Sequence, residues 1–343
     1  MTTYTDYILE QTKNVLAIDS PTGFTQKAAD YVMAEYKKLG YEPYLTNKGG
    51  ILVCVSEGKT DDAVILESHI DTLGAMVCDI TKDGRLKLTP LGGMNPNNAE
   101  AENCRIYTRD DKVYSGTFQL QNASVHVNDN YSKTTRSYDV MEVVLDEIVE
   151  KKEDVLALGI MPGDIVCFDP RTVITESGFI KSRFLDDKLS VGILLGYAKY
   201  LKENNVVTDR KIYQYITVFE EVGHGGSSSI PTDVTEILVV DMGCVGDGLG
   251  CKETQVSICA KDSSGPFHYD VVTGLVKAAK ASGIDFAVDV YPHYSSDAAT
   301  GLRAGNDCRH GLIGSGVYAS HGYERSHVKG VENTFGLLKA YLG

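Results

Sequence analysis

The chain has 343 residues, of which 43% are hydrophobic and 23% are charged, a balance that is typical of a folded globular protein. This length is enough for one large domain, or for a large domain with a smaller one. The 33 basic and 47 acidic side chains give a formal net charge of -14. Such a charge excludes a general binder of nucleic acid or of anionic membranes, because those proteins need a positive field.

The sequence carries no sign of a membrane span or of export. No run of about 18 or more apolar residues is present, which argues against a transmembrane helix. The opening segment MTTYTDYILEQTKN contains acidic residues and lacks the basic start of a signal peptide. The eight cysteines are scattered without a CxxC pair, which favours buried, reduced thiols. We therefore expect a cytoplasmic protein.

The first part of the chain predicts an α/β fold. Residues 1–40 are predicted to be helical, because TQKAADYVMAEYKKLG has apolar residues at helical spacing and the pattern stops at Gly40. Two runs rich in Val and Ile follow, ILVCVSE at 51–57 and DAVILESHI at 62–70, and both predict strands. Helices followed by strands indicate the α/β class.

The pattern changes between about residue 75 and residue 180. Short β-like pieces alternate there with turn signals such as KDGRL and LGGMNPNN. One segment, 134–159, is predicted to be a helix with Glu and Lys on its solvent face. We therefore predict that 75–180 is a β-rich module inserted into a single α/β domain, which consists of 1–74 and 181–343.

The α/β pattern resumes after residue 181. Helices are predicted at 189–203, 267–283 and 331–343. Strands are predicted at 210–219, 235–243, 253–261 and 285–291.

Residues of the kinds that bind metals stand at the ends of several predicted strands or at the start of the next element. In α/β sheets, ligands gather at such ends. The candidates are His69, Asp71, Asp186, Asp187, Glu220, Glu221, Asp241 and, in the loop before the last helix, His321.

Each candidate has an ordinary structural explanation when it is taken alone. His69 and Asp71 could be a structural histidine and its carboxylate partner. Asp186 could cap the helix that follows it. The GHGG segment after Glu221 could be a tight turn or a phosphate cradle.

The whole set indicates a two-metal site. Four acidic groups that converge on one strand-end region without cations would repel one another and raise their own pKa values. A pair of divalent cations removes this conflict, and imidazole with carboxylate suits Zn²⁺, Co²⁺ or Mn²⁺. A two-metal site also needs a carboxylate that can bridge ions about 3.5–4 Å apart.

These motifs resemble the glutamyl aminopeptidase family of two-metal aminopeptidases, which includes deblocking and tetrahedral aminopeptidases and proteins once labelled cellulase M. The resemblance runs over nearly the whole chain, and the order and spacing of the motifs make it specific. In chain order the motifs are SHIDTLGAMV, ALGIMPGDIVCFD, FLDDKLSVG, FEEVGHGGS, LVVDMG, SSDA around Asp297, and ASHGYERSHVKGVENTFGLLKAYL.

The resemblance implies a set of metal ligands. It implies that His69, Asp186 and Asp241 surround one metal ion. It implies that Asp186, Glu221 and His321 surround the other, so that Asp186 bridges the two. The cofactor would be two divalent ions per subunit, with Zn²⁺ and Co²⁺ as first candidates and Mn²⁺ as a further one.

The resemblance also implies catalytic roles and an architecture. Asp71 would orient His69, and Glu220 would be the general base that activates the attacking water. The fold would be a central mixed sheet flanked by helices, with an inserted small β-barrel used for assembly. Dimers would build a hollow tetrahedral dodecamer, and the substrates would be short peptides.

Two positions depart from the family pattern. Lys188 follows the Asp-Asp pair where the family commonly has Arg, and His321-Gly-Tyr replaces the usual His-Ser-Pro. His327, six residues further on, is a second candidate for the last ligand. We favour His321 because its distance to the last helix fits the family.

Two other functions stay open. A deacylase or carboxypeptidase on a related two-metal scaffold differs in which end of the substrate is anchored, and a non-catalytic assembly protein would keep the fold without the chemistry. An acidic N-terminal residue as substrate would require a cation in the pocket. The sequence does not place any of its candidates there, which are Lys188, Arg303, Arg309 and Arg325.

Overall fold

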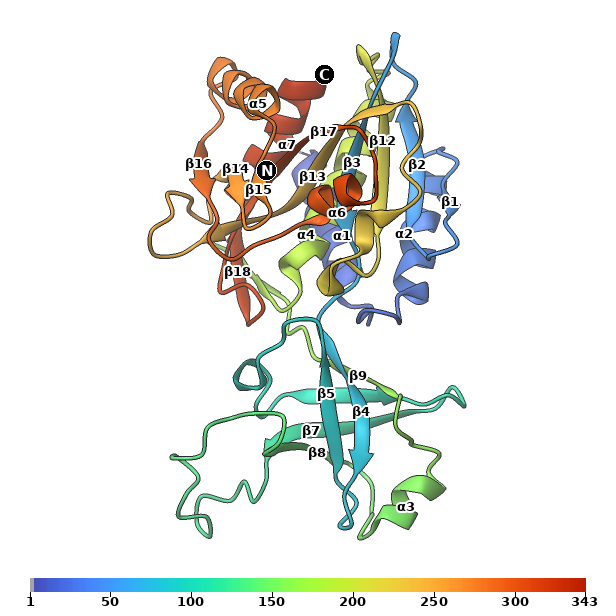
Figure 1. Ribbon diagram of the computed structural model, residues 1–343, viewed down its shortest axis with the longest axis vertical. Helices are drawn as coiled ribbons and strands as arrows, with labels where there is room; N and C mark the ends of the chain where they lie inside the picture. The colour runs from blue at the N-terminus through green and yellow to red at the C-terminus, as the bar shows by residue number, and fades with distance from the viewer. Residues whose placement is uncertain (1–2) are drawn as a thin grey trace. The chain divides into compact units, whose positions relative to one another are not determined.

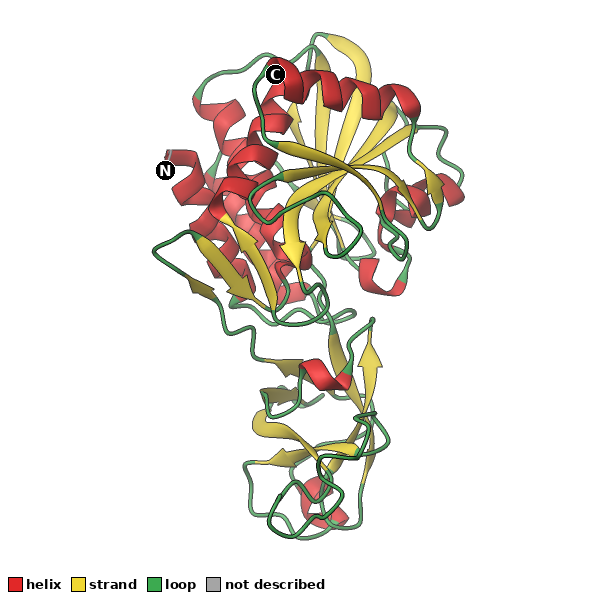
Figure 2. Ribbon diagram, turned by 90° about the vertical axis from the view of Figure 1, so that its left-hand side faces the viewer, coloured by secondary structure: helices red, strands yellow, loops and turns green. Residues whose placement is uncertain are grey.

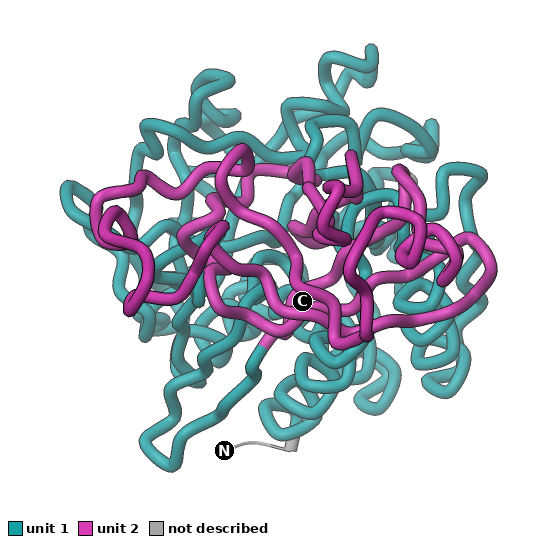
Figure 3. Tube along the Cα trace, turned by 90° about the horizontal axis from the view of Figure 1, so that it is seen from below, with its two compact units in different colours: residues 1–71, 171–343 teal, residues 72–170 magenta. Residues whose placement is uncertain are grey.

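The computed structural model describes residues 3–343 and divides into two compact units (Figure 3). One unit contains the chain up to Asp71 and Arg171–Gly343, and the other contains Thr72–Pro170. Residues 1 and 2, which the predicted N-terminal helical region included, lie outside the described residues. The sequence pattern placed the insertion at 75–180, whereas residues from 171 onward belong to the first unit because two short strands there pair with its sheet.

A 12-stranded mixed sheet forms the centre of the first unit (Figure 1). Its main path runs in the order β1-β2-β12-β3-β13-β17-β18-β11-β10, and β14, β15 and β16 pair beside this path. The neighbours β12, β3, β13 and β17 are parallel to one another. The strands are β1 Tyr44–Leu45, β2 Ile51–Ser56, β3 Thr60–His69, β10 Val173–Ile174, β11 Phe179–Ser182, β12 Arg210–Thr217, β13 Val234–Val245, β14 Val256–Asp262, β15 Gly265–Pro266, β16 Phe286–Val290, β17 Arg309–Tyr318 and β18 Glu324–His327.

Helices cover both sides of this sheet (Figure 2). α1, α4 and α7 pack on one another, and α4 and α7 also pack on the sheet, while α6 packs on β13 and β17. Because the central strand β3 is covered on both faces, Ala63, Val64, Ile65 and Leu66 are all fully buried. The helices are α1 Thr3–Leu16, α2 Gln26–Lys38, α4 Leu185–Glu203, α5 Tyr269–Ala281, α6 Asp297–Arg303 and α7 Val328–Leu342.

The second unit is a closed antiparallel barrel with the strand order β4-β5-β8-β7-β6-β9. Its elements are β4 Gly74–Ile80, β5 Leu86–Leu91, a 3₁₀ turn η1 Pro96–Asn98, β6 Asn103–Tyr107, β7 Val113–Leu120, β8 Met141–Leu145, α3 Lys152–Ala157 and β9 Ile165–Phe168. A mixed sheet flanked by helices, together with a small barrel, confirms the predicted fold class.

The prediction of a single helix over residues 134–159 is wrong. Its first half contains strand β8, in which Met141, Val143 and Leu145 are buried while the residues between them are half-buried. This period of two is the strand signal, and it places three side chains inside the barrel. Only the six residues of α3 are helical.

Strand β17 was not predicted, and its sequence RHGLIGSGVY contains three glycines. The structure explains why one of these glycines stands in a central strand. A Cβ atom on Gly314 would lie 1.9 Å from the carbonyl oxygen of Asp241 on β13, so no larger residue fits at this register.

Two further observations concern membrane spans and the state of the cysteines. No helix within residues 3–343 is long and apolar enough to cross a membrane. All eight cysteines are free thiols, and four of them are buried.

Candidate metal centre

The parallel strands bring the predicted ligands to one edge of the large sheet. His69 is the last residue of β3, and Asp241 lies in the second half of β13. Glu220 and Glu221 form the 3₁₀ turn η2 Glu220–Val222, just after β12. His321 lies in the loop that follows β17. Because the carboxyl ends of parallel strands meet at one edge, residues far apart in the sequence become neighbours there.

Two groups of side chains have the spacing of a metal site. Ligand atoms of His69, Asp187 and Asp241 lie within 4.8 Å of one another. Ligand atoms of His69, Asp186 and Glu221 form a second group with the same spacing. Asp187 is therefore a further carboxylate with metal-ligand spacing, in addition to the expected ligand Asp186. Its Oδ2 atom accepts hydrogen bonds from the Ser68 hydroxyl at 2.6 Å and the His69 backbone N–H at 3.1 Å.

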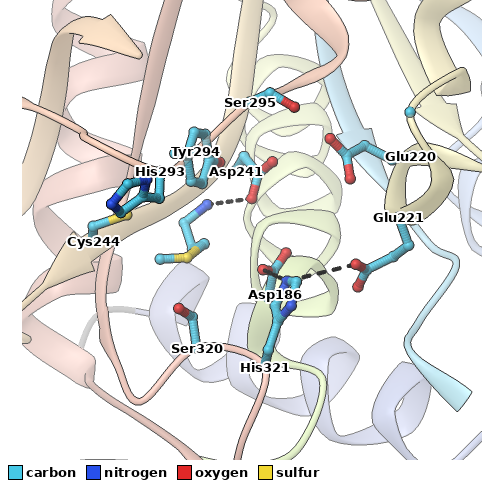
Figure 4. Close-up of a pocket in the computed structure, with 12 residues that line it drawn as sticks. Asp186, Glu220, Glu221, Asp241, Cys244, His293, Tyr294, Ser295, Ser320 and His321 are labelled. Carbon is cyan, nitrogen blue, oxygen red and sulfur yellow. Dashed lines mark hydrogen bonds and ion pairs between the residues drawn. The ribbon is translucent and has the colours of Figure 1, made fainter. Parts of the chain in front are cut away.

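Asp186 lies between the two histidines. Its Oδ1 atom is 3.1 Å from Nε2 of His69, and its Oδ2 atom is 3.6 Å from Nε2 of His321. His321 is also 3.6 Å from Oε2 of Glu221 (Figure 4). A carboxylate that faces a ring nitrogen on each side has the position of a bridging ligand.

The orientation of His69 suits a metal ligand. Its Nδ1 atom lies 2.9 Å from the carbonyl oxygen of Asp71, so Nδ1–H donates there. The Nε2 atom lies 3.1 Å from Oδ1 of Asp186. Burial lowers the pKa of this imidazole, but its hydrogen bonds to Asp186 and Asp71 outweigh burial and raise the pKa well above its usual value. A metal ion at Nε2 would take the place of the proton there, and the second nitrogen of a ligating histidine ordinarily donates to a carbonyl or carboxylate oxygen.

Asp71 also fixes the backbone of the two glutamates. Its carboxylate is completely buried and accepts from the backbone N–H of Glu220 at 3.2 Å and of Glu221 at 3.4 Å. The hydroxyl of Thr22 donates to it at 2.7 Å. Asp71 therefore couples the orientation of His69 to the position of η2.

The two candidates for the last ligand have different surroundings. His321 faces Asp186 and Glu221, as described above. Both ring nitrogens of His327 are already engaged, because Nε2 bonds to the carbonyl of Ser177 at 3.0 Å and Nδ1 accepts from the backbone N–H of Lys329 at 3.0 Å. His327 ends strand β18, and its side chain caps the N-terminus of helix α7.

Glu324 was not predicted from the sequence, and it supports the cluster through two backbone hydrogen bonds. Its carboxylate accepts from the backbone N–H of Asp186 at 3.1 Å and from that of His321 at 3.0 Å. It therefore joins the start of α4, which carries Asp186, to the loop that carries His321. No sequence signal marks the bond to Asp186, because this residue lies far from Glu324 in the chain.

The cluster carries more negative charge than the protein itself neutralises. Burial raises the pKa of the Glu220, Glu221 and Asp187 carboxyls well above their usual values. Burial, and then repulsion by Asp186, raises the pKa of Asp241 to about 7. Both Oε1 of Glu221 and Oδ1 of Asp187 are buried without a hydrogen-bond partner.

This donor set fits two divalent ions. Imidazole and carboxylate are the ligands that Zn²⁺, Co²⁺ and Mn²⁺ share, and cations would satisfy the buried oxygens and remove the repulsion. Lys188, the nearest lysine in sequence, does not serve this purpose, because its ammonium donates to the carbonyls of Val15 and Ile18.

The cluster opens into a cavity of about 370 Å³ (Figure 4). No lysine or arginine is among the described residues that line it. The lining residues are Asp186, Glu220, Glu221, Gly223, Asp241, Met242, Cys244, His293, Tyr294, Ser295, Ser320 and His321.

The carboxylate of Asp297 lies against Gly225 in the GHGG turn. A Cβ atom on Gly225 would lie 2.3 Å from Oδ2 of Asp297, and that same oxygen accepts from the hydroxyl of Thr217 at 2.6 Å. The ammonium of Lys48 donates to the carbonyl of Gly225 at 2.8 Å and to Ser227 Oγ at 3.1 Å. The turn after η2 is therefore held by Asp297 and Lys48, and the glycine makes room for this carboxylate.

Comparison with known proteins assigns the class of this fold and site. A family model described as M42 glutamyl aminopeptidase matches residues 49–337. The chain belongs to this family, which confirms the resemblance inferred from its motifs. It is a peptide hydrolase of the aminopeptidase class.

The chain is similar to a Bacillus subtilis (strain 168) protein, YhfE, with 42% identity over 334 residues, which cover 97% of this chain and 96% of that one. An aminopeptidase from the archaeon Desulfurococcus kamchatkensis has a similar structure, with a TM-score of 0.87 and 22% identity over 99% of this chain and 95% of that one. The TET1 peptidase of Pyrococcus horikoshii matches with a TM-score of 0.84 and 20% identity over 97% of this chain and 98% of that one. At these identities, the two solved structures establish the fold alone.

Proposed function

We propose that this protein is a metal-dependent aminopeptidase that removes N-terminal residues from short peptides. The observation that carries the proposal is the convergence of buried carboxylates and two histidines at one edge of the sheet, with buried oxygens left without a partner. Two divalent ions would be held there, with Zn²⁺ or Co²⁺ as first candidates and Mn²⁺ as a further one.

Five residues hold the two ions in this proposal. His69, Asp186 and Asp241 surround one, and Asp186, Glu221 and His321 surround the other. The position of Asp186 between the two histidines supports its role as the bridge. When bound, such a pair of ions lowers the pKa of a water molecule and polarises the peptide carbonyl.

Glu220 serves as the general base. It lines the cavity, and its Oε2 atom is 3.8 Å from Nε2 of His69, but it belongs to neither of the two groups with metal-ligand spacing. Its carboxylate takes the proton of the attacking water and passes it to the leaving amine. Asp71 keeps this carboxylate in reach, because it binds the backbone N–H of Glu220 and also orients His69.

The alternatives have less support. A carboxypeptidase needs a cation for the terminal carboxylate of its substrate, and no lysine or arginine is among the described residues that line the cavity. A non-catalytic assembly protein would have no reason to retain five ligands, a base and a carboxylate that orients them.

We further propose that the subunits form a closed homo-oligomer, a dodecamer built from dimers through the barrel unit. The Pyrococcus horikoshii TET1 peptidase assembles into a tetrahedron or a large octahedral shell. In the barrel unit of this chain Ile148 is completely exposed and Val127 is 73% exposed, as expected of side chains that a partner covers. The cytoplasmic location expected from the sequence stays a prediction.

A single assay tests the proposed activity. Chelator-treated protein is incubated with a short peptide in three forms: free at its N-terminus, N-acetylated, or amidated at its C-terminus. Mass spectrometry should detect stepwise loss of N-terminal residues from the free and amidated peptides, only after Zn²⁺ or Co²⁺ is added, and none from the acetylated form. Removal of the acetyl group or of C-terminal residues would reject the proposal in favour of a deacylase or a carboxypeptidase.

A further inference from the structure

The cavity has two chemically different walls. The carboxylates of Glu220 and Glu221 lie on one side (Figure 4). Cys244, His293 and Tyr294 lie together on the opposite side (Figure 4). Met242, whose backbone adjoins Asp241, also lines the cavity, so that these side chains together contribute a thioether, a thiol, a phenol and an imidazole. We call Met242, Cys244, His293 and Tyr294 the neutral wall.

The thiol of Cys244 and the phenol of Tyr294 are side chains that are ordinarily uncharged at neutral pH. Met242 is 2% exposed and its backbone N–H donates to Oδ1 of Asp241 at 2.6 Å, so its backbone is fixed at the edge of the cluster. His293 is exposed, so solvent screens whatever charge it carries.

None of the four candidate cations named from the sequence lines the cavity, and each has contacts elsewhere. Lys188 is 1% exposed and its ammonium donates to the carbonyls of Val15 and Ile18. Arg303 lines a different, smaller cavity and donates to Oγ of Ser264 at 3.3 Å.

The other two candidate cations, Arg309 and Arg325, also have partners in the first unit. Arg309 begins strand β17 and forms an ion pair with Glu236 at 3.3 Å, at the opposite end of the parallel strands from the metal cluster. The guanidinium of Arg325 stacks over the ring of Phe179, 3.9 Å from its centroid.

A basic substrate side chain finds no free partner either. The carboxylates that line the cavity are the proposed ligands Asp186, Glu221 and Asp241 and the proposed base Glu220. Each is already committed to an ion or to proton transfer, so an ammonium or guanidinium group on the substrate would be desolvated without a dedicated counter-charge.

We infer that the neutral wall receives the side chain of the substrate's N-terminal residue and that this enzyme prefers an uncharged, apolar residue there, above all methionine, leucine or phenylalanine. Sulfur atoms pack well against apolar and aromatic groups, and a charged side chain would lose its hydration without gaining a partner. This inference rests on the proposed function and departs from the glutamyl preference in the family's name.

The test compares the tripeptides Met-Ala-Ala, Glu-Ala-Ala and Lys-Ala-Ala on the metal-loaded, full-length enzyme, with release of the free N-terminal amino acid as the readout. The ratio kcat/KM should be larger for Met-Ala-Ala than for either charged peptide by about 100-fold or more, because a pocket built for one polarity rejects the other strongly. A preference for Glu or Lys would overturn the inference while leaving the proposed function intact. Failure to release any N-terminal residue would instead reject the proposed function.

A change of specificity tests the location of the pocket. His293→Lys adds a fixed cation to the neutral wall, and His293→Gln is the matched control without a charge. The ratio of Glu-Ala-Ala to Met-Ala-Ala kcat/KM should rise about 10-fold or more in the Lys variant and stay near the wild-type ratio in the Gln variant. An unchanged ratio in the Lys variant, or an equal rise in both variants, would show that the neutral wall does not contact the substrate side chain.

Discussion

Buried carboxylates stand at both ends of the parallel strands of the large sheet, but their partners differ. At the end where these strands begin, Glu236 is 2% exposed and lies 3.1 Å from Arg210 and 3.3 Å from Arg309. The hydroxyl of Tyr341 donates to it at 2.9 Å. Every charge of this cluster therefore has a partner within the chain.

The end where the strands finish is different. Glu221 and Asp187 each have a buried oxygen without a hydrogen-bond partner, and burial raises the pKa of both. The comparison shows that burial alone does not distinguish a structural carboxylate from a functional one. The difference between these two clusters lies in whether the chain itself supplies the counter-charge.

The largest effect is expected from Asp186→Ala at the unpaired end. The variant should lose both metal ions and fall to background activity, because the bridging carboxylate touches both ions while each other ligand touches one. Elemental analysis after gel filtration measures the loss, and Glu236→Gln, from the paired end, is the control that should keep two ions. If Asp187→Ala loses both ions and Asp186→Ala keeps one, then Asp187 is the bridge.

The adjacent glutamates should fail in two different ways. Glu220→Gln keeps the ions but cannot accept the proton of water, so kcat should fall by about 10²-fold or more with little change in KM. Glu221→Gln removes a charged ligand, so its activity should recover in part at high metal concentration. Steady-state kinetics over a metal titration separates the two. Equal loss of metal from both variants would remove Glu220 from the role of base.

The two histidines of the C-terminal region give a smaller and more selective effect. His321→Ala should lose about one ion per subunit, because its ring faces only one of the two ligand groups. His327→Ala should keep both ions, because its nitrogens are engaged by Ser177 and Lys329. Metal content per subunit decides between them, and the reverse result would move the last ligand to His327.

The smallest effect on metal binding is expected at the paired end. Glu236→Gln leaves Arg210 and Arg309 with a neutral partner, so the free energy of unfolding should fall by about 1–3 kcal/mol. Urea denaturation of the metal-loaded protein measures this change. Loss of metal from Glu236→Gln would contradict the separation of the two ends.

Much of the fold follows from patterns in the sequence. The Val- and Ile-rich runs predicted β2, β3, β12 and β13, and helical spacing predicted α4, α5 and α7. The prediction failed where two signals competed. Residues 134–159 contain Glu and Lys at helical intervals, but Met141, Val143 and Leu145 alternate on a barrel strand, and tertiary pairing decided the outcome.

The candidate site was predictable in its residue types but less so in its contacts. The strand-end positions of His69, Glu221 and Asp241 were visible as motifs, since α/β sheets gather ligands there. The bond of Glu324 to Asp186, and the close approach of Gly225 to Asp297, were not visible, because they join segments far apart in the chain.

The most direct test of the account is a calorimetric titration of chelator-treated wild-type protein with Zn²⁺. The unpaired carboxylates at the carboxyl ends of the strands should bind two ions per subunit, and the loaded protein should then release N-terminal residues from a short peptide. Binding of no more than one ion per subunit, with full peptidase activity, would contradict the two-metal site.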